Sequence, residues 1–440
     1  MATATIPSHP LLAGAESLLD GPGGQPGFLA ERRRQAAASF AGLGLPTRAW
    51  EEWRFTGVSH LEEAQWTVAE RAPQLPSIDE PPLGDANRLV VVDGWLEPGL
   101  SRLQGLPDGV FAGSLAEAVV RRPELVEPHL VRHAALNDHP FVALNAAQFR
   151  DGVLLWIPAG MVLDRPIELQ LVARRHRRPT LALPRVLIVA GRSSQAAVVH
   201  RSAGGSADTL TCSVTEVVLE DGAVLDHYSV VDDDHGATHI AALEVRQGRD
   251  SAMHSGVFVT GGGLVRSDLA VTLGGAGAGA TLEGLYLTSG RQHVDNHLLV
   301  RHSVPSCTSR QLYKGILDGS SRAVFNGRIV VDKGAQKTDA RQSNRNLLLS
   351  PAALVQSNPQ LEILADDVRC THGSTIGRLD EDAVFYLRSR GLDRTSAESL
   401  LTWAFAAEVV EGVRVPELRD RLRRAVAARL PSSQMIEELL

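Results

Sequence analysis

The sequence predicts a mainly β protein whose strands stack into a solenoid, with a mostly helical region on each side. Between residues 141 and 378, short apolar or alternating runs such as RVLIVAG and AVFNGRIVVDKGA recur every 8 to 15 residues or so. Glycine, aspartate and asparagine separate them, and no helix of ordinary length intervenes. A sandwich or a barrel also fits this pattern. We favour a solenoid because roughly 200 residues of strand continue without a closing motif, and stacked turns bury one another.

Residues 1–140 predict a mixed, mostly helical region. The run GFLAERRRQAAASFAGLGLP reads as a helix that Gly42, Gly44 and Pro46 stop. NRLVVVDGWL reads as a short strand and turn. Further on, SLAEAVVRRPELVEPHLVRHAALN reads as helical pieces that Pro123 and Pro128 interrupt.

Residues 379–440 return to helix. The segment TSAESLLTWAFAAEVV begins with Thr395 and Glu398 at capping-box spacing. Its apolar stripe comprises Ala397, Leu400, Leu401, Ala404 and Phe405.

A second helix, PELRDRLRRAVAARL, starts at Pro416 and carries Leu418, Leu422 and Val426 on one side. Its arginines are able to bind an acidic partner, although a solvated face is the simpler interpretation.

The totals indicate an ordinary soluble protein of two or three domains. Of the 440 residues, 44% are apolar and 22% charged. The net charge of -7 argues against a general nucleic-acid binder. The start, MATATIPSHPLLAG, does not read as a signal peptide, and no apolar run is long enough to predict a membrane span. Cys212, Cys307 and Cys370 are too few and too far apart for a disulfide framework, so we expect a cytoplasmic protein with reduced thiols.

One candidate metal site is the alternating trio His293, Asp295 and His297. On a strand, all three side chains project from one face. Imidazole and carboxylate ligands suit zinc or iron. Ligands along one strand lie too far apart to close a tetrahedral site alone, so a polar outer face is the favoured alternative.

Two loops invite a ligand, and for both we favour a plain turn or loop. Residues 272–282, TLGGAGAGATL, have neither the lysine of a phosphate-binding loop nor its strand-to-helix context. The sequence therefore predicts no nucleotide site. Asp232, Asp233 and Asp234 would suit a hard cation, but an acidic loop needs none.

Cys370 and His372 lie two positions apart near the end of the strand-rich region. On a strand they share a face. A thiolate is a soft ligand and neutral imidazole a good iron ligand. Two ligands do not complete a cluster site, so a partner chain or solvent would have to supply the others. From the residues alone, a buried structural cysteine is the favoured interpretation.

The stretch from 295 to 392 resembles the SufB/SufD family of iron–sulfur cluster assembly proteins. The resemblance rests on DNHLLVRHSVPSCTSRQLYKGILDG, AVFNGRIVVDKGAQKTDARQSNRNLLLS and PQLEILADDVRCTHGSTIGRLDEDAVFYLRSRGL, in family order. EEWRFT and NAAQFRDGVLLWIPAGMVLDRPIEL are also similar to it. The SufB type has glutamate after the histidine, whereas Gly373 follows His372 here, which resembles the SufD type.

This resemblance implies a right-handed parallel β-helix flanked by helical N- and C-terminal domains. It implies a scaffold subunit that is not itself an enzyme. Such a subunit pairs with a SufB-type paralogue through the C-terminal end of its β-helix. A SufC-type ABC ATPase binds its C-terminal helices and supplies the nucleotide site.

The resemblance also implies a site. His372 would face a SufB cysteine where a transient iron–sulfur cluster forms, with Cys370 beside it. A cysteine desulfurase or sulfur carrier would deliver sulfur indirectly, and flavin binding stays open. The alternatives are a purely structural subunit, a homodimer of the same fold, or a polysaccharide-active solenoid enzyme.

Overall fold

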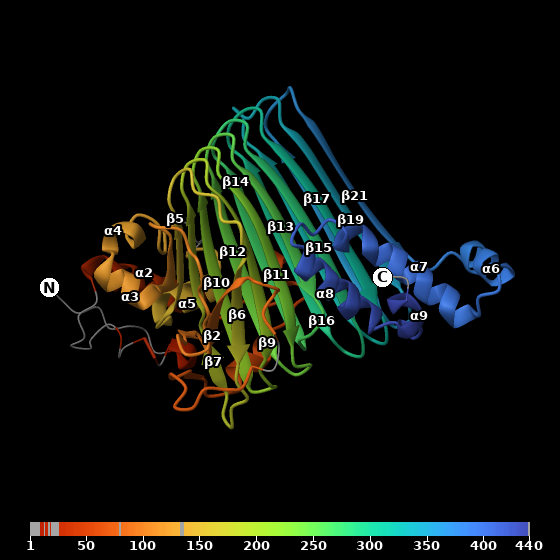
Figure 1. The fold of residues 1–440 in the computed structure, drawn as a ribbon, viewed down its shortest axis with the longest axis horizontal. Coiled ribbons are helices and arrows are strands. Elements are labelled where there is room, and N and C mark those ends of the chain that lie inside the picture. Colours follow the sequence, from red (N-terminus) through yellow and green to blue (C-terminus); the bar gives the residue numbers. More distant parts are fainter. Residues whose placement is uncertain are drawn as a thin grey trace.

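A parallel β-solenoid of two facing sheets forms the centre of the computed structural model, which describes residues 9–12, 14–15, 18, 26–78, 81–132 and 136–438 (Figure 1). From β8 on, successive strands alternate between the sheets. Sheet A runs in the order β20-β18-β16-β14-β12-β10-β8-β5-β4, with β7 paired to β10 and β1 paired to β7. Sheet B runs β21-β19-β17-β15-β13-β11-β9-β6-β2-β3. The predicted solenoid is confirmed.

The strands have the following bounds: β1 Thr67–Val68, β2 Asn87–Val92, β3 Trp95–Leu96, β4 Phe111–Ser114, β5 Gly152–Ile157, β6 Ile167–Ala173, β7 Thr180–Ala182, β8 Arg185–Ala190, β9 Gln195–Gly204, β10 Thr209–Leu219, β11 Val224–Asp233, β12 Thr238–Gln247, β13 Ala252–Val259, β14 Leu264–Leu273, β15 Gly279–Thr288, β16 His293–His302, β17 Thr308–Leu317, β18 Arg322–Val331, β19 Asp339–Leu348, β20 Leu354–Ile363 and β21 Arg369–Gly377. The helices are η1 Pro10–Leu12, α2 Gly27–Leu43, η2 Glu51–Trp53, η3 Ser59–Glu62, α3 Leu115–Arg121, α4 Pro123–Val126, α5 Pro140–Gln148, α6 Glu381–Ser389, α7 Arg394–Val410, α8 Pro416–Ala427 and α9 Ser433–Glu437.

One turn of the solenoid takes about 29 residues, since Gly279 on β15 pairs with Thr308 on β17. Because the strands of successive turns pair in parallel and in register, paired residues point to the same face. Close backbone approaches between turns require glycine. A Cβ on Gly275 would lie 2.0 Å from the backbone nitrogen of Arg249. The glycine-rich run is therefore a turn between β14 and β15, as predicted.

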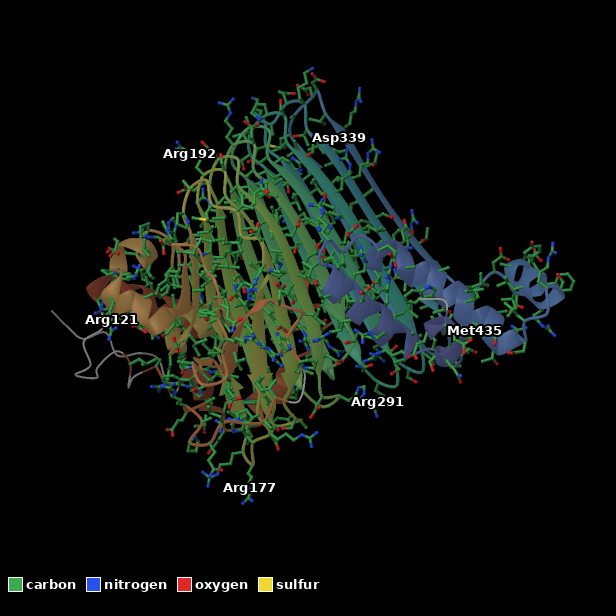
Figure 2. All side chains as sticks on the ribbon, viewed as in Figure 1. Arg121, Arg177, Arg192, Arg291, Asp339 and Met435 are labelled. Atoms are coloured by element: carbon green, nitrogen blue, oxygen red, sulfur yellow. The ribbon has the colours of Figure 1, made fainter. Side chains whose placement is uncertain are left out.

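The solenoid interior is mainly apolar, with Val217, Val271, Leu298 and Phe325 in one cluster. Helices cover much of the outer faces as well. This is why strands such as β8 read as continuous apolar runs rather than alternating ones. Charged side chains stand at the turns along both long edges, with Arg192 and Asp339 on one and Arg291 on the other (Figure 2).

Helices α2 to α5 pack on the outer face of sheet A, where Phe40 and Phe141 join Leu187 and Ile240 in one cluster. Helices α7, α8 and α9 cover the outer face of sheet B (Figure 1). Helix α6 projects beyond the last strand (Figure 1). No helix within the described ranges is long and apolar enough to cross a bilayer.

Most expected N-terminal elements are confirmed. Helix α2 ends at Leu43, before Gly44, and β2 and β3 form the expected strand and turn. Pro123 separates α3 from α4 and occupies the first turn of α4. Part of the predicted helical stretch, residues 133–135, lies outside the described residues. Strand β2 also pairs with β6 and so extends sheet B. The boundaries at 140 and 378 stay predictions.

Helix α8 buries Leu418, Leu422 and Val426, as predicted. The predicted capping box of α7 is wrong, because Asp393 is the N-cap and accepts the backbone N–H of Ser396. The predicted stripe is also shifted. Ala397 is buried but Ala404 is exposed, and the buried face instead comprises Ala397, Ser399, Thr402, Trp403, Ala406, Val409 and Val410.

Candidate functional site

The solenoid ends in an uncovered turn made of β20 and β21. Each of these strands pairs on one side only among the described strands. Cys370 lies in register with Ala340, and His372 with Gln342. Ala340 and Gln342 are buried in the interior, at 0% and 3% exposure. Cys370 and His372 therefore occupy the same inward-facing row of the last turn, and the prediction that they share a face is confirmed.

The two residues differ in burial. Cys370 is half-buried against a small apolar cluster that includes Ile329, Ala340 and Ala365. Burial raises the pKa of the Cys370 thiol, and the nearby Asp339 carboxylate raises it further. His372 is exposed. Hence the imidazole is the more available ligand, and the thiol would ionise readily only beside a cation or metal.

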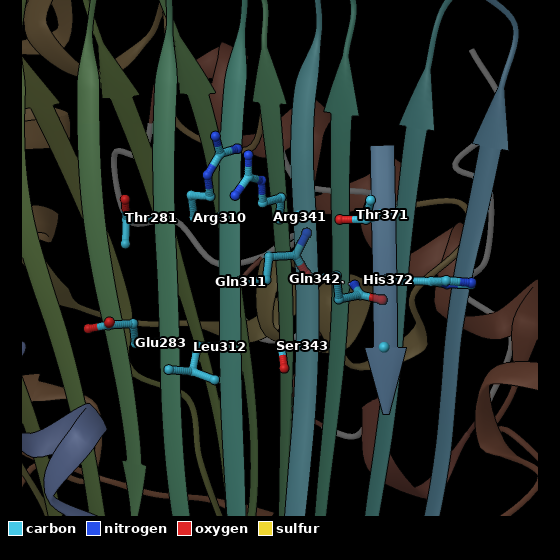
Figure 3. A pocket seen from close by; sticks show the side chains of 11 residues that line it. Thr281, Glu283, Arg310, Gln311, Leu312, Arg341, Gln342, Ser343, Thr371 and His372 are labelled. Carbon is cyan, nitrogen blue, oxygen red and sulfur yellow. Dashed lines mark hydrogen bonds between the residues drawn. The ribbon is translucent and has the colours of Figure 1, made fainter. Parts of the chain in front are cut away.

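The His372 ring extends past the last strand, away from its register neighbour (Figure 3). No hydrogen bond or ion pair of this ring is found among the described residues. Ser374, two positions on, donates to Ser357 Oγ (2.8 Å), which donates to Asn344 Oδ1 (2.8 Å). The hydrogen bond between the two serines thus joins β21 to β20 across the open end, whereas the His372 side chain makes no such bond among the described residues.

An open cavity of about 430 Å³ lies on sheet B beside His372 (Figure 3). Arg310, Arg341 and Glu283 contribute to its lining. Arg310 Nη2 donates to Asp339 Oδ2 (2.7 Å), and this hydrogen bond lowers the pKa of Asp339. The cavity therefore presents charged groups on the outer face, next to the inward-facing row that holds His372.

The trio His293, Asp295 and His297 points from the outer face of sheet A, as expected for alternating residues. Thr56 donates to Asp295 Oδ2 (2.5 Å), and its oxygen lies 2.9 Å from His293 Nε2. His297 Nε2 lies 3.0 Å from Asp295 Oδ1. The trio thus holds the EEWRFT segment, residues 51–56, against the sheet.

Arg266 extends this network. It donates to Asp295 Oδ2 (2.8 Å) and to Asp268, and its guanidinium lies 3.7 Å from the centre of the Trp53 ring. Burial alone would raise the pKa of Asp295, but His297 and Arg266 lower it to about 2. No group of three or more His, Cys, Asp or Glu with metal-site geometry occurs among the described residues. Metal binding by the trio stays a prediction.

The three aspartates of the acidic loop have separate partners. Thr260 donates to Asp232 (2.8 Å), Arg175 donates to Asp234 (2.7 Å), and Asp233 faces the interior. These contacts fit a structural role, but the predicted loop is wrong for Asp232 and Asp233, which lie at the end of β11.

A buried Ser–His–Asp chain lies where β10, β11 and β12 meet. Asp233 Oδ2 is 2.7 Å from His239 Nδ1, and His239 Nε2 is 3.1 Å from Ser213 Oγ. This is the contact order of a serine hydrolase triad. All three side chains are buried between the sheets, so the chain joins neighbouring turns.

Sequence reasoning missed the partners of the candidate residues. Thr56 and Arg266 are 239 and 29 positions from Asp295, respectively. One signal was available for Gln342. In β19, polar Gln342, Asn344 and Asn346 alternate at the buried positions, which marks an inward polar row.

Comparison with known proteins gives one consistent family. Residues 172–405 match the model "SUF system FeS cluster assembly, SufBD core domain", and residues 23–169 match "SufBD protein N-terminal region". An iron–sulfur cluster assembly SufBD family protein of Synechocystis is 32% identical over 92% of both chains. The iron–sulfur cluster assembly protein SufD of Escherichia coli is 31% identical over 88% of this chain and 90% of its own. SufD of Bacillus subtilis is 28% identical over 73% and 75%, respectively. The chain therefore belongs to the SufB/SufD family and has a role in iron–sulfur cluster assembly.

Proposed function

We propose that this chain is a SufD-type scaffold subunit in which the open end of the solenoid helps form the site of nascent cluster assembly. The supporting observation is the position of His372. It lies in the inward-facing row of the last turn, yet it is exposed because no further turn covers it. The iron–sulfur cluster is the cargo of this site, and a partner chain supplies the remaining ligands.

The uncovered strands support pairing with a SufB-type paralogue. Long unpaired edges are templates for another chain, and natural proteins normally cover or break them. Around this end several large apolar side chains are exposed: Leu354 (46%), Ile363 (40%), Leu364 (57%) and Ile376 (49%). A second solenoid end placed here would pair the strand edges and bury these side chains. A homodimer is the competing arrangement of the same surface.

The C-terminal helices, residues 379–440, are the proposed dock for a SufC-type ATPase. Helix α6 stands clear of the solenoid (Figure 1). It exposes 72% of Phe385 and 57% of Tyr386. Exposed aromatic side chains are typical anchors of protein interfaces. The ATPase would supply nucleotide-driven rearrangement, provided that nucleotide binds two states of the complex with different affinity.

The proposed cargo pathway follows from ligand chemistry. A cysteine desulfurase or sulfur carrier delivers sulfur indirectly, and the cluster forms at the interface in the cytoplasm. His372 is the proposed ligand or site former, and Cys370 has a supporting role. Imidazole and thiolate ligands at an open interface hold iron and still allow transfer when the interface opens.

Anaerobic co-expression with a SufB-type paralogue and a SufC-type ATPase tests this proposal. We expect the three chains to co-purify with iron and acid-labile sulfide. Recovery of this chain alone, or as a stable homodimer in the presence of the paralogue, would contradict the assignment.

Ile376→Asp is expected to abolish pairing with the paralogue, because it places a charge in an apolar interface. The isolated variant should fold normally, since Ile376 is 49% exposed. Co-purification yield measures the effect, and Leu103→Asp is the matched control because Leu103 is 39% exposed and belongs to the N-terminal region. Wild-type yield of the Ile376→Asp complex would rule out the open end as the interface.

A further inference from the structure

Gln342 is a buried amide directly behind His372 in the solenoid. The two residues are register partners on β19 and β21. Gln342 is 3% exposed. Side chains of register partners in a parallel sheet project to one face from strands about 4.8 Å apart. The amide therefore lies within reach of the imidazole when the ring turns toward the interior.

The Gln342 amide is held in place from two sides. Its Nε2 donates to Gln311 Oε1 (2.8 Å), one turn further inside (Figure 3). It also fills the space left by a glycine on the opposite sheet, since a Cβ on Gly327 would lie 2.2 Å from Gln342 Nε2. These contacts hold the amide group in place. With Nε2 assigned as the donor to Gln311, the oxygen of Gln342 is the remaining group, and Gln311 Nε2 is likewise without a partner among the described residues.

The Gln342 oxygen is buried without a hydrogen-bond partner among the described residues. A buried acceptor left unsatisfied costs about 1–3 kcal/mol. The next inward-facing residue of β19, Asn344, does have hydrogen-bond donors for its side-chain oxygen. Asn344 Oδ1 accepts from Asn346 (2.7 Å) and from Ser357 (2.8 Å). An unused acceptor thus stands at the register position of His372.

We propose that Gln342 is a positioning residue for His372, whose ring N–H it accepts through its side-chain oxygen. A neutral imidazole has one N–H and one unprotonated nitrogen. Fixing the N–H toward Gln342 leaves the other nitrogen free to face the interface. Metal-bound histidines almost always donate their second ring nitrogen in this way. The inference rests on the proposed role of His372.

The ring has to rotate for this contact, because it extends past the last strand in Figure 3. Side-chain rotamer changes are common when partners bind. A partner that covers the open end removes the solvent that now surrounds the ring. The contact requires the His372 side chain to turn over the amide.

The test compares three changes at this position in the co-expressed complex. Gln342→Leu keeps the volume and removes the acceptor, whereas Gln342→Glu keeps an acceptor oxygen. A double variant, Gln311→Leu with Gln342→Leu, removes both amides together and so leaves neither unpaired. Gln360→Leu is the matched control, because Gln360 pairs in register with exposed Arg328 on the outer face of sheet A.

The first measurement is the tautomer of His372 in the cluster-free complex, from ring ¹⁵N chemical shifts assigned with His372→Asn. We expect one tautomer in the wild type, in Gln342→Glu and in Gln360→Leu, and a mixture in both leucine variants at position 342. The same tautomer population in Gln342→Leu as in the wild type would overturn the proposal.

The second measurement is iron loss from the loaded complex to a ferrous chelator. We expect loss to be about 10- to 100-fold faster in Gln342→Leu and in the double variant. Equal rates in wild type and Gln342→Leu would also overturn it. If His372→Ala keeps its cluster, the proposed function fails, and the tautomer measurement still decides the Gln342–His372 contact separately.

Discussion

Glu216→Ala is expected to lower the free energy of unfolding by about 3–5 kcal/mol, because it strands a buried charge. Glu216 and Arg185 form an ion pair with both side chains at 0% exposure. Glu216 also accepts the backbone N–H of Val131 (2.7 Å) and of Arg132 (3.2 Å). The substitution therefore leaves two backbone donors without their acceptor, between sheet A and the N-terminal region. The Arg185 guanidinium keeps Asn145 Oδ1 (3.1 Å) as an acceptor but loses the charge of Glu216.

Urea unfolding measures this loss, with Glu362→Ala as the matched control. Glu362 pairs with Arg328 where both side chains are about half exposed, and such a pair contributes at most about 1 kcal/mol. A combined Arg185→Met, Glu216→Leu variant should recover much of the stability, since it removes both charges. A loss in Glu216→Ala no larger than in Glu362→Ala would contradict this expectation.

The protein is expected to lose stability as pH falls from about 6.5 to about 4, because histidines are buried in the solenoid interior. Burial lowers the pKa of His200 and of His302 to about 4 each, and it lowers that of His227 well below its usual value. In this window the unfolded chain binds protons that the folded chain does not. Each histidine therefore costs up to about 2 kcal/mol at pH 5, from a usual pKa of roughly 6.5.

Urea unfolding at pH 7.5 and pH 5 measures this dependence in His302→Gln. Glutamine retains a donor for Ser309 Oγ, which lies 2.9 Å from His302 Nε2, and it does not titrate. The difference between the two pH values should shrink by about 2 kcal/mol relative to the wild type. His235→Gln is the control at an exposed position and should leave the difference unchanged. If the free energy of unfolding differs between pH 7.5 and pH 5 as much in His302→Gln as in the wild type, His302 does not contribute to the pH dependence.

Local pattern predicted the strands and favoured a solenoid, although a sandwich or a barrel fits the same pattern. Apolar runs, glycine turns and the strand period predicted the strands and placed Cys370 and His372 on one face. Pattern was not enough for α7, where two overlapping stripes of apolar residues fit a helical period. Packing against sheet B and α8 favours the face that contains Trp403 and Val410. The predicted N-cap was also displaced. The Asp393 carboxylate caps the helix two residues before Thr395.

The surroundings of the site depend on contacts between residues far apart in the chain. Thr56 reaches Asp295 because the N-terminal segment folds back on sheet A, which spacing along one strand does not reveal. His372 is exposed because β21 belongs to the last turn of the solenoid. In an earlier turn, the same position would be buried. The resemblance to a family marked the residue, and the arrangement of β19, β20 and β21 shows what surrounds it.

The most direct test of His372 as part of the cluster site is the iron and acid-labile sulfide content of the complex that carries His372→Ala. Thr371→Ala is the matched control, one position away on the exposed outer face. We expect both variants to assemble with the paralogue and the ATPase. Cluster content should fall about tenfold or more in His372→Ala only, because a ligand or site former is lost. Wild-type cluster content in assembled His372→Ala would contradict the account and leave this chain a purely structural subunit.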